Sequence, residues 1–321
     1  MNDASSDRRP LALMTVHAHP DDETITTGGV MAKAVHDGHR VVLITATRGE
    51  QGEIVVPAMD TPDNHRRLGE IRMAELEAAM GVLGVTEWDN LGYRDSDMKG
   101  RVGNADPRSF ARADFDEAVG RLVWFIRRHR PHVMTTYDES KGYDHPDHIR
   151  VHQISQPAFE RADDPAWYPE QLTPESGGSG PTAEDGGLEP WAPRKLYEPV
   201  FPLSLWRTMF ERLEARGEAN PWAPSADATL EERAALETQM AEALTTEEAI
   251  TTRVDVSPFL DAKWDALHRH ATQISAEFPL VIMGLDGWRE FWPSESFILR
   301  ASRDVNVQLP ETDLFAGLSQ A

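Results

Sequence analysis

The first half of the chain alternates short apolar runs with longer stretches of helical periodicity. Apolar, β-branched runs predict buried strands at 11–16, 41–47 and 132–137. Amphipathic patterns predict helices at 29–36, 63–83 and 115–129. Strands that alternate with helices are typical of a mostly parallel sheet with right-handed crossovers. We therefore expect an α/β fold with a Rossmann-like, mostly parallel sheet flanked by helices.

The pattern changes after about residue 162. Residues 163–192 are rich in Gly, Pro, Ser and acidic residues, which indicates a long surface loop. The chain beyond this loop predicts a strand at 195–201, an acidic helix at 227–249, a strand at 250–256 and a helix at 258–274. We expect four parts, with the last completing the domain and its substrate pocket: a flexible tail (1–10), an α/β catalytic core (11–162), the loop (163–192) and a smaller α+β C-terminal portion (193–321).

Composition excludes several classes of protein. A hydrophobic fraction of 40% is too high for a disordered chain, and no apolar stretch approaches the roughly 20 residues needed to cross a bilayer. The polar start lacks the pattern of a signal peptide, so we expect a cytoplasmic protein. A formal net charge of −22 disfavours binding to nucleic acid or to anionic membranes. Because the chain has no cysteine, histidine and carboxylate side chains are its candidate metal ligands. The pattern carries no signal for an oligomeric state.

Two similar clusters of acidic residues and histidines follow predicted strands. The first is AHPDDE at 18–23, and the second is YDHPDH at 143–148. In open α/β sheets ligands collect at the carboxyl ends of the strands, so both clusters should meet at one edge, with the second in a loop. His19, Asp22 and His148 are then candidate metal ligands. Two neutral imidazoles and one carboxylate suit a single catalytic zinc ion, and ferrous iron uses the same set.

The other polar residues of the clusters point to amide hydrolysis. A divalent ion would polarise an amide carbonyl and acidify water. We expect Asp21 to accept the water proton and later to protonate the departing amine. We expect His145, oriented by Asp147, to stabilise the oxyanion as an imidazolium, with Tyr143 as a second candidate donor. Glu23 is left unassigned, because the helix dipole also favours an acidic residue in a first turn.

Other functional classes fit the motifs less well. The first strand-to-helix turn reads HPDDETITTGG where a dinucleotide site would need GxGxxG, and the sequence has no GxSxG elbow of a serine hydrolase. A carbohydrate- or metal-binding protein without turnover is a further alternative. Because every candidate catalytic position is occupied, we favour an enzyme.

The two clusters together resemble the signature of the LmbE/PIG-L-like zinc deacetylases. The resemblance extends along nearly the whole chain, through VHAHPDDE (16–23), GEQGEI (49–54), PAMDTPD (57–63), RPHVMTTYDE (130–139), GYDHPDHIRVHQ (142–153), HATQI (270–274), WPSESF (292–297) and PETDLFAGL (310–318). Within the family the chain is most similar to the mycothiol S-conjugate amidases and their sister deacetylases of N-acetylglucosaminyl-inositol. PAMD and the last three motifs favour the amidases.

The resemblance implies the same metal and catalytic residues as the chemistry above, and it adds residues for substrate binding. Arg72 and Asp95 match positions that contact the sugar-inositol part of the substrate. Simpler alternatives are a helix-surface ion pair between Arg72 and Glu75, and an ordinary turn at Asp95. Thr26 stands where the amidases carry a lysine tied to substrate recognition, so recognition at this position should differ.

The resemblance implies two related reactions on small molecules. The main prediction is zinc-dependent cleavage of the amide bond in mycothiol S-conjugates, which releases glucosaminyl-inositol and an N-acetylcysteine S-conjugate in the detoxification of electrophiles. The alternative is deacetylation of N-acetylglucosaminyl-inositol, or of another N-acetylated amino sugar, by the same chemistry.

Overall fold

The computed structural model describes residues 10–139, 143–173, 187–217, 229–231 and 244–318. Within these residues seven strands form one sheet in the order β3-β2-β1-β4-β5-β7-β6. The strands are β1 (Ala12–His17), β2 (Arg40–Thr45), β3 (Glu87–Asn90), β4 (Val133–Thr135), β5 (Lys195–Val200), β6 (Thr252–Asp255) and β7 (Ser294–Ser302). The five strands from β3 to β5 in this order are parallel, whereas β7 and β6 are antiparallel to their neighbours. The prediction of a mostly parallel α/β sheet is therefore confirmed.

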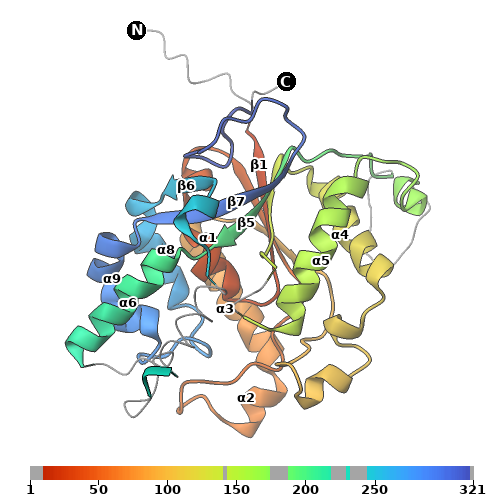
Figure 1. Ribbon diagram of the computed structural model, residues 1–321. Coiled ribbons are helices and arrows are strands. Elements are labelled where there is room, and N and C mark those ends of the chain that lie inside the picture. Colours follow the sequence, from red (N-terminus) through yellow and green to blue (C-terminus); the bar gives the residue numbers. More distant parts are fainter. Residues whose placement is uncertain (1–9, 140–142, 174–186, 218–228, 232–243, 319–321) are drawn as a thin grey trace.

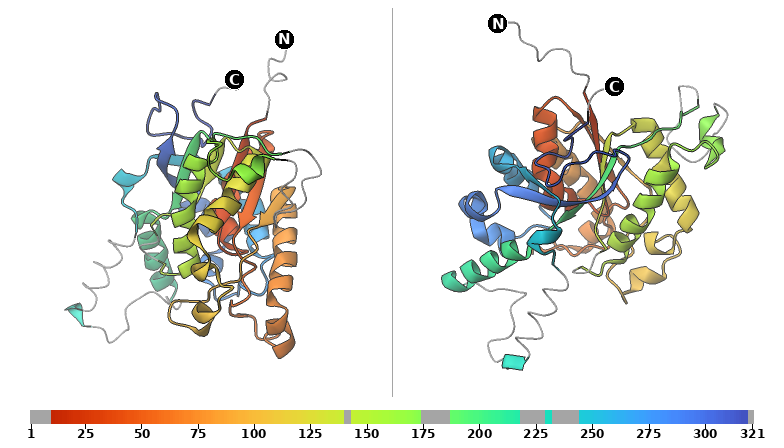
Figure 2. Two further views of the ribbon diagram at one scale, coloured as in Figure 1. Left: turned by 90° about the vertical axis from the view of Figure 1, so that its right-hand side faces the viewer. Right: turned by 45° about the horizontal axis from the view of Figure 1, so that its top comes forward.

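Helices cover both faces of the sheet, as Figures 1 and 2 show. The helices are α1 (Asp22–His36), α2 (Pro62–Arg66), α3 (Leu68–Leu83), α4 (Phe115–His129), α5 (Pro146–Arg161), α6 (Leu203–Arg216), α8 (Leu260–Leu267) and α9 (Pro279–Phe291). In Figure 1, α4 and α5 lie to the right of the sheet, and α6, α8 and α9 lie to the left.

The central strand β1 is buried along its whole length, which explains its continuous apolar sequence. Successive side chains of a strand point to opposite faces, and β1 follows this rule. Leu13 packs into the core shared by α1, α3 and the C-terminal helices, whereas Met14 packs into the core under α4 and α5. The carboxyl end of β1 therefore leads into a loop that is supported from both layers.

Helix α1 begins at Asp22, seven residues before the predicted start at 29. The glycines at 28 and 29 obscured the pattern, but the fold requires a small residue there. A Cβ on Gly29 would lie 2.7 Å from the Cβ of Val256, and the Gly29 N–H donates to Glu295 Oε1 at 2.8 Å. Gly29 therefore allows α1 to approach β7 and Val256, and Gly28 faces Lys263 of α8.

The other elements match the prediction unevenly. Helix α4 has the predicted bounds, because Asp114 accepts the N–H of Glu117 at its start and basic residues occupy its last turn. The predicted helix at 63–83 is broken at Arg67, whose φ is −111°. The predicted helix at 258–274 ends at Leu267, and α5, α6, α9, β3 and β7 were not predicted.

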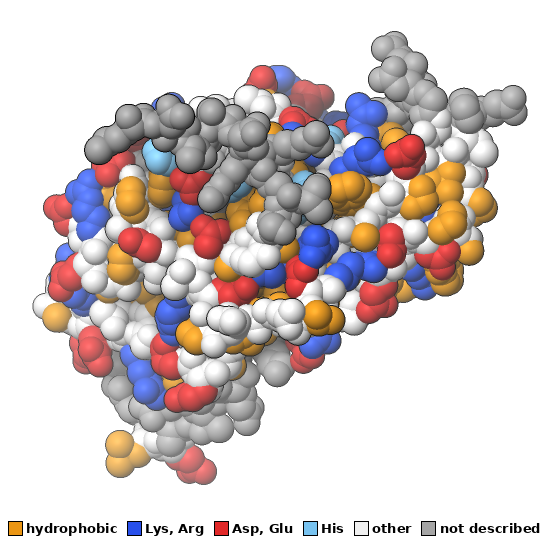
Figure 3. All heavy atoms as spheres, turned by 90° about the horizontal axis from the view of Figure 1, so that it is seen from above, with side chains coloured by type: hydrophobic (Ala, Val, Ile, Leu, Met, Phe, Trp, Pro, Cys, Tyr) orange, Lys and Arg blue, Asp and Glu red, His pale blue; other side chains and the backbone are white. Residues whose placement is uncertain are grey.

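Several predictions fall outside the described residues. They concern most of the flexible tail (1–9), the middle of the loop (174–186) and much of the acidic helix (227–228 and 232–243). Among the described residues, none of the helices combines the length and the apolar character that a membrane span requires. On the face shown in Figure 3, acidic and basic side chains are interspersed. That face therefore offers no basic stripe for a polyanion.

Candidate active site and metal centre

The two predicted clusters meet at the carboxyl ends of the neighbouring strands β1 and β4. The first cluster forms the turn from β1 into α1, and the second leads into α5. The expectation that both lie at one edge of the sheet is thus met. His148, however, lies in the first turn of α5 and not in a loop.

His19, Asp22 and His148 form a compact set of candidate ligands. One ligand atom from each lies within 4.8 Å of the others. Asp22 Oδ2 is 3.4 Å from His19 Nδ1 and 3.4 Å from His148 Nε2. Burial by itself would raise the pKa of Asp22, but the two histidines outweigh it and hold the pKa well below its ordinary value. The carboxylate therefore stays ionised, as a metal ligand must.

The donor chemistry of this set fits a divalent metal ion. His148 Nε2 is buried and has no hydrogen-bond partner among the described residues, although a buried imidazole nitrogen normally has one. An ion between the two imidazoles and the carboxylate would satisfy it. Two nitrogens and one carboxylate oxygen suit zinc, with positions left for water and substrate.

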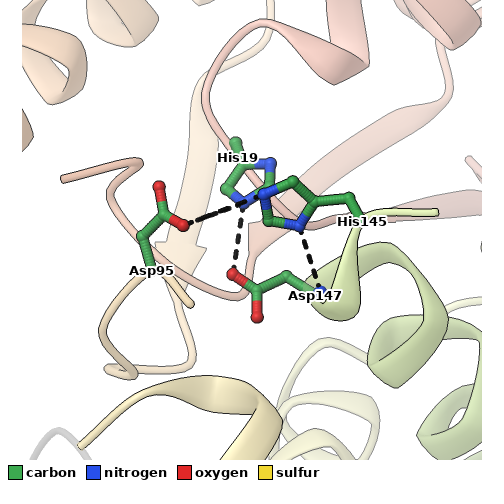
Figure 4. Close-up of side chains that lie close together, drawn as sticks. All are labelled: His19, Asp95, His145 and Asp147. Atoms are coloured by element: carbon green, nitrogen blue, oxygen red, sulfur yellow. Dashed lines mark hydrogen bonds and ion pairs between the residues drawn. The ribbon is translucent and has the colours of Figure 1, made fainter. Parts of the chain in front are cut away.

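The Asp147 carboxylate contacts a candidate metal ligand. Its Oδ2 lies 3.2 Å from His19 Nε2, as Figure 4 shows. Because a carboxylate only accepts, Nε2 carries the proton and Nδ1 presents its lone pair toward Asp22 and the metal position. The N–H of Ser96 at 3.0 Å and the Ser96 hydroxyl fix the carboxylate. Asp147 is predicted to orient His145, but its carboxylate contacts His19 instead, and only its backbone N–H reaches His145.

His145 is held as a neutral donor. Its Nδ1 accepts the backbone N–H of Asp147 at 3.2 Å and so caps the start of α5. The ring proton must then be on Nε2, which points toward Asp95 Oδ1 at 4.0 Å. Burial, with the nearby His19, lowers the pKa of His145 to about 4. The expectation of an imidazolium is thus wrong, although a neutral Nε2–H can still stabilise an oxyanion.

The tautomer of His145 also decides how a second group of close side chains should be understood. His19, Asp95, His145 and Asp147 offer ligand atoms within 4.8 Å of one another. To bind a metal, His145 would need the lone pair of Nε2. Because Nδ1 accepts a hydrogen bond, Nε2 carries the ring proton and has no free lone pair. We therefore treat this group as a hydrogen-bonding network beside the metal ligands.

Asp21 lies in an unusual backbone conformation and pairs with an arginine. Its φ is 125°, which is rare for a residue other than glycine. Its Oδ2 is 3.1 Å from Arg72 Nη2, and the same guanidinium donates to the carbonyls of Pro20 at 2.6 Å and Gly49 at 3.0 Å. Burial raises the pKa of Asp21 to about 6, against the pull of Arg72 and with the help of Asp22.

Arg72 is therefore neither a surface residue nor a partner of Glu75. It is 3% exposed, and Glu75 instead accepts the N–H and the hydroxyl of Thr272 at 2.8 and 2.7 Å. A Cβ on Gly49 would lie 2.1 Å from Arg72 Nη1, so a glycine is required at this position. The alternative of a helix-surface ion pair is thus wrong.

The remaining predicted residues lie at different distances from the metal ligands. Asp95 accepts the N–H groups of Gln51 and Asp97, and its Oδ1 is 3.7 Å from His19 Nε2. Tyr143 is half-exposed, with its ring centroid 4.9 Å from that of His148. Thr26 lies on α1, and its hydroxyl donates to the carbonyl of Asp22 at 2.8 Å. The Thr26 hydroxyl is therefore already used within the helix.

Four residues of the site were not predicted as parts of it. Ser96 holds Asp147, and the Tyr137 hydroxyl accepts the N–H of Ala18 at 2.9 Å. Glu23 and His270 contact each other at 2.9 Å in full burial. Tyr137 and His270 lie in quoted motifs, and Ser96 follows Asp95, but sequence motifs do not state which residues touch.

Comparisons with known proteins agree with this geometry. The family model described as "PIG-L: GlcNAc-PI de-N-acetylase" matches residues 14–159. A 1D-myo-inositol 2-acetamido-2-deoxy-alpha-D-glucopyranoside deacetylase of Geodermatophilus obscurus is 38% identical over 95% of this chain and 97% of its own. The protein of that name from Nocardiopsis dassonvillei is 39% identical over 95% of this chain and 100% of its own. The chain belongs to the PIG-L family.

Solved structures show the same fold at low identity. The N,N'-diacetylchitobiose deacetylase of Pyrococcus horikoshii aligns with a TM-score of 0.58 at 17% identity, covering 90% of this chain and 83% of its own. The protein TT1542 of Thermus thermophilus aligns with a TM-score of 0.52 at 20% identity, covering 92% and 97%. As a member of the PIG-L family with close relatives named as deacetylases, the chain is a hydrolase of amide bonds.

Proposed function

We propose that this PIG-L family member removes the acetyl group from 1D-myo-inositol 2-acetamido-2-deoxy-α-D-glucopyranoside, an N-acetylglucosaminyl-inositol. The observation that carries the proposal is the similarity along almost the whole chain to relatives named for this reaction, together with the candidate metal ligands at the sheet edge. The substrate is thus a small, uncharged amino sugar, which suits a protein of formal net charge −22.

This proposal follows the alternative from the sequence and not its main prediction. Four short motifs favoured cleavage of mycothiol S-conjugates, but relatives that are 36–39% identical to this chain are named as deacetylases. Thr26 points the same way, because it replaces the lysine of the amidases and its hydroxyl is bonded to Asp22. Deacetylation is therefore the better supported reaction.

We assign the metal to His19, Asp22 and His148, with zinc as the first choice. A bound zinc ion would polarise the acetyl carbonyl and lower the pKa of water at the site. Asp147 keeps the proton of His19 on Nε2, so that Nδ1 remains a ligand atom. The buried Nε2 of His148, which has no hydrogen-bond partner among the described residues, supports this assignment.

The other roles belong to groups that surround this position. Asp21 accepts the proton of the attacking water and returns it to the nitrogen when the C–N bond breaks. His145 donates its Nε2–H to the oxyanion, and Tyr143 at the rim can add a second hydrogen bond. We assign Asp95 to the sugar, where its carboxylate would accept a hydroxyl. Arg72 acts on the substrate only indirectly, through Asp21.

The direct test is hydrolysis by the purified, zinc-loaded protein. With N-acetylglucosaminyl-inositol we expect release of free amine and acetate, and we expect a higher kcat/KM than with the bimane conjugate of mycothiol. The Asp21→Asn variant is the matched control, because it should bind metal and lose most turnover. Faster cleavage of the conjugate would instead support the amidase reaction, and no free amine from the amino sugar would overturn the proposal.

A further inference from the structure

The backbone of Asp21 requires support from its surroundings. A residue other than glycine at φ 125° is strained, and such conformations persist only where neighbouring groups hold them. The strain falls on the proposed base, between strand β1 and helix α1. Its carboxylate is held by Arg72. The backbone must be held by something else.

Glu23 supplies the contact to the backbone. Its Oε2 accepts the N–H of Asp21 at 2.8 Å, and its side chain is fully buried in the first turn of α1. Asp21 is the residue before the first turn of α1, so the helix itself offers no acceptor for its N–H. The direction of the Asp21 side chain therefore depends on where the Glu23 carboxylate lies.

His270 in turn fixes the Glu23 carboxylate. His270 Nε2 lies 2.9 Å from Glu23 Oε1, to which the Thr24 hydroxyl also donates at 2.6 Å. His270 is fully buried and follows α8. It is 247 residues away from Glu23 in the chain. Its turn is fastened independently by Thr272, which donates its N–H and hydroxyl to Glu75 on α3. The position of the carboxylate is thus set by the C-terminal portion.

We propose that Glu23 and His270 are positioning residues that hold Asp21 in the conformation in which it can act as the base. Asp21 is then held by two contacts: Arg72 pairs with its carboxylate, and Glu23 accepts its backbone N–H. The inference rests on the proposed function, because it takes Asp21 as the base. It goes beyond that function by giving the C-terminal portion a part in the proton transfer.

An ordinary helix cap does not explain this arrangement. Helices α2 and α4 are capped by Thr61 and Asp114 at the surface, and within the described part of the chain no distant segment adds a further partner to either cap. At α1 the carboxylate is completely buried, which carries a large desolvation cost unless partners compensate it. A buried histidine delivered from the C-terminal portion is such a partner, and a cap alone would not require it.

The first experiment compares two substitutions of Glu23 in the zinc-loaded enzyme. Glu23→Leu removes the acceptor for the Asp21 N–H, and we expect kcat to fall on the order of 10²-fold with KM within about threefold. Zinc content should stay at the wild-type level, because Asp22 and both histidine ligands remain. Glu23→Gln keeps a carbonyl oxygen for the N–H, and both His270 and Thr24 can accept from its amide. We expect it to recover most of the kcat.

The second experiment substitutes His270, the partner of Glu23, and includes a control variant. His270→Leu should lower kcat with KM and zinc content retained, whereas His270→Gln, which keeps a donor, should be less impaired. The double variant Glu23→Leu/His270→Leu should lose no more than Glu23→Leu alone if the two act as a unit. Asp114→Ala removes the surface cap of α4 and touches neither Glu23 nor His270, so it should lower thermal stability and keep kcat.

The outcomes separate this inference from the proposed function. A wild-type enzyme without deacetylase activity would overturn the proposed function and this role with it. An active wild type with unchanged kcat in Glu23→Leu and His270→Leu would overturn the positioning role alone. If the variants lost zinc and activity to the same extent, the positioning role would also be overturned, because Glu23 and His270 would then support the metal ligands. If Glu23→Leu does not fold, the comparison of His270→Leu with His270→Gln still decides.

Discussion

Replacement of Asp147 by asparagine tests whether this residue serves the metal ligand His19. The carboxylate accepts hydrogen bonds from His19 Nε2, the Ser96 N–H and the Ser96 hydroxyl. Asparagine has a single acceptor oxygen, so at least one of the three is lost. If its amide group faces His19, the imidazole must move its proton to Nδ1, the atom that faces Asp22 at 3.4 Å.

The size of the effect follows from the loss of this contact. Removal of a carboxylate that orients a ligand histidine lowers metal affinity by about 10–100-fold. At 1.36 kcal/mol for each factor of ten, this corresponds to about 1.4–2.7 kcal/mol. We therefore expect the apparent Kd for zinc of Asp147→Asn to rise by this factor. The assay is a zinc titration against a competing chelator at fixed pH, with Ser96→Ala as a milder control.

One result would refute this reasoning. If Asp147→Asn binds zinc within about threefold of the wild type and nevertheless loses turnover, the residue acts on catalysis without acting on the metal ligand. The sequence interpretation, in which Asp147 serves His145, would then describe the working enzyme better than the hydrogen bonds do. If Asp147→Asn and the wild type had equal zinc affinity and equal turnover, the contact between Asp147 and His19 would have no role in function.

Three further predictions concern catalysis, packing and pH. His145→Phe removes the oxyanion donor and should lower kcat by roughly 10²–10³-fold with zinc content unchanged; steady-state kinetics and metal analysis check this. Gly29→Ala places a Cβ 2.7 Å from that of Val256 and should destabilise the fold by about 1–3 kcal/mol in urea unfolding, so an unchanged midpoint would contradict the packing argument. Burial lowers the pKa of His132, whose Nδ1 accepts the N–H of Ala12, so the unfolded chain binds a proton more readily and stability should fall as the pH drops below 6.5. His132→Asn, which can accept the same N–H without titrating, should lose less stability between pH 7 and pH 5.5, and an equal loss would exclude His132 as the cause.

The cluster of candidate metal ligands could be predicted because its sequence signals are local. His19 and Asp22 are three residues apart, and His148 belongs to a similar motif after another strand. The rule that ligands gather at the carboxyl ends of parallel strands was then enough to bring them together. No detail of side-chain geometry was needed for that step.

The hydrogen-bonding partners could not be predicted, because they depend on how distant segments are packed. Asp147 is two residues from His145 in the second cluster, yet its carboxylate faces His19, 128 residues away. Arg72 and Glu75 are at ion-pair spacing on α3, but the helix turns Arg72 toward Asp21 in the buried site. Sequence proximity suggested the wrong partner in both cases. A side chain pairs with whatever the tertiary fold brings within reach.

The contact between Glu295 and the middle of α1 has a consequence for the order in which the protein is completed. Glu295 receives the N–H groups of Gly29 and Val30, and it becomes available only after about nine-tenths of the chain has been synthesised. The residues assigned to the metal all emerge from the ribosome in the first half. The set of candidate ligands is therefore complete in the nascent chain before Glu295, which holds the helix of Asp22, has been synthesised. A chain truncated before β7 would keep every candidate ligand and lose this contact.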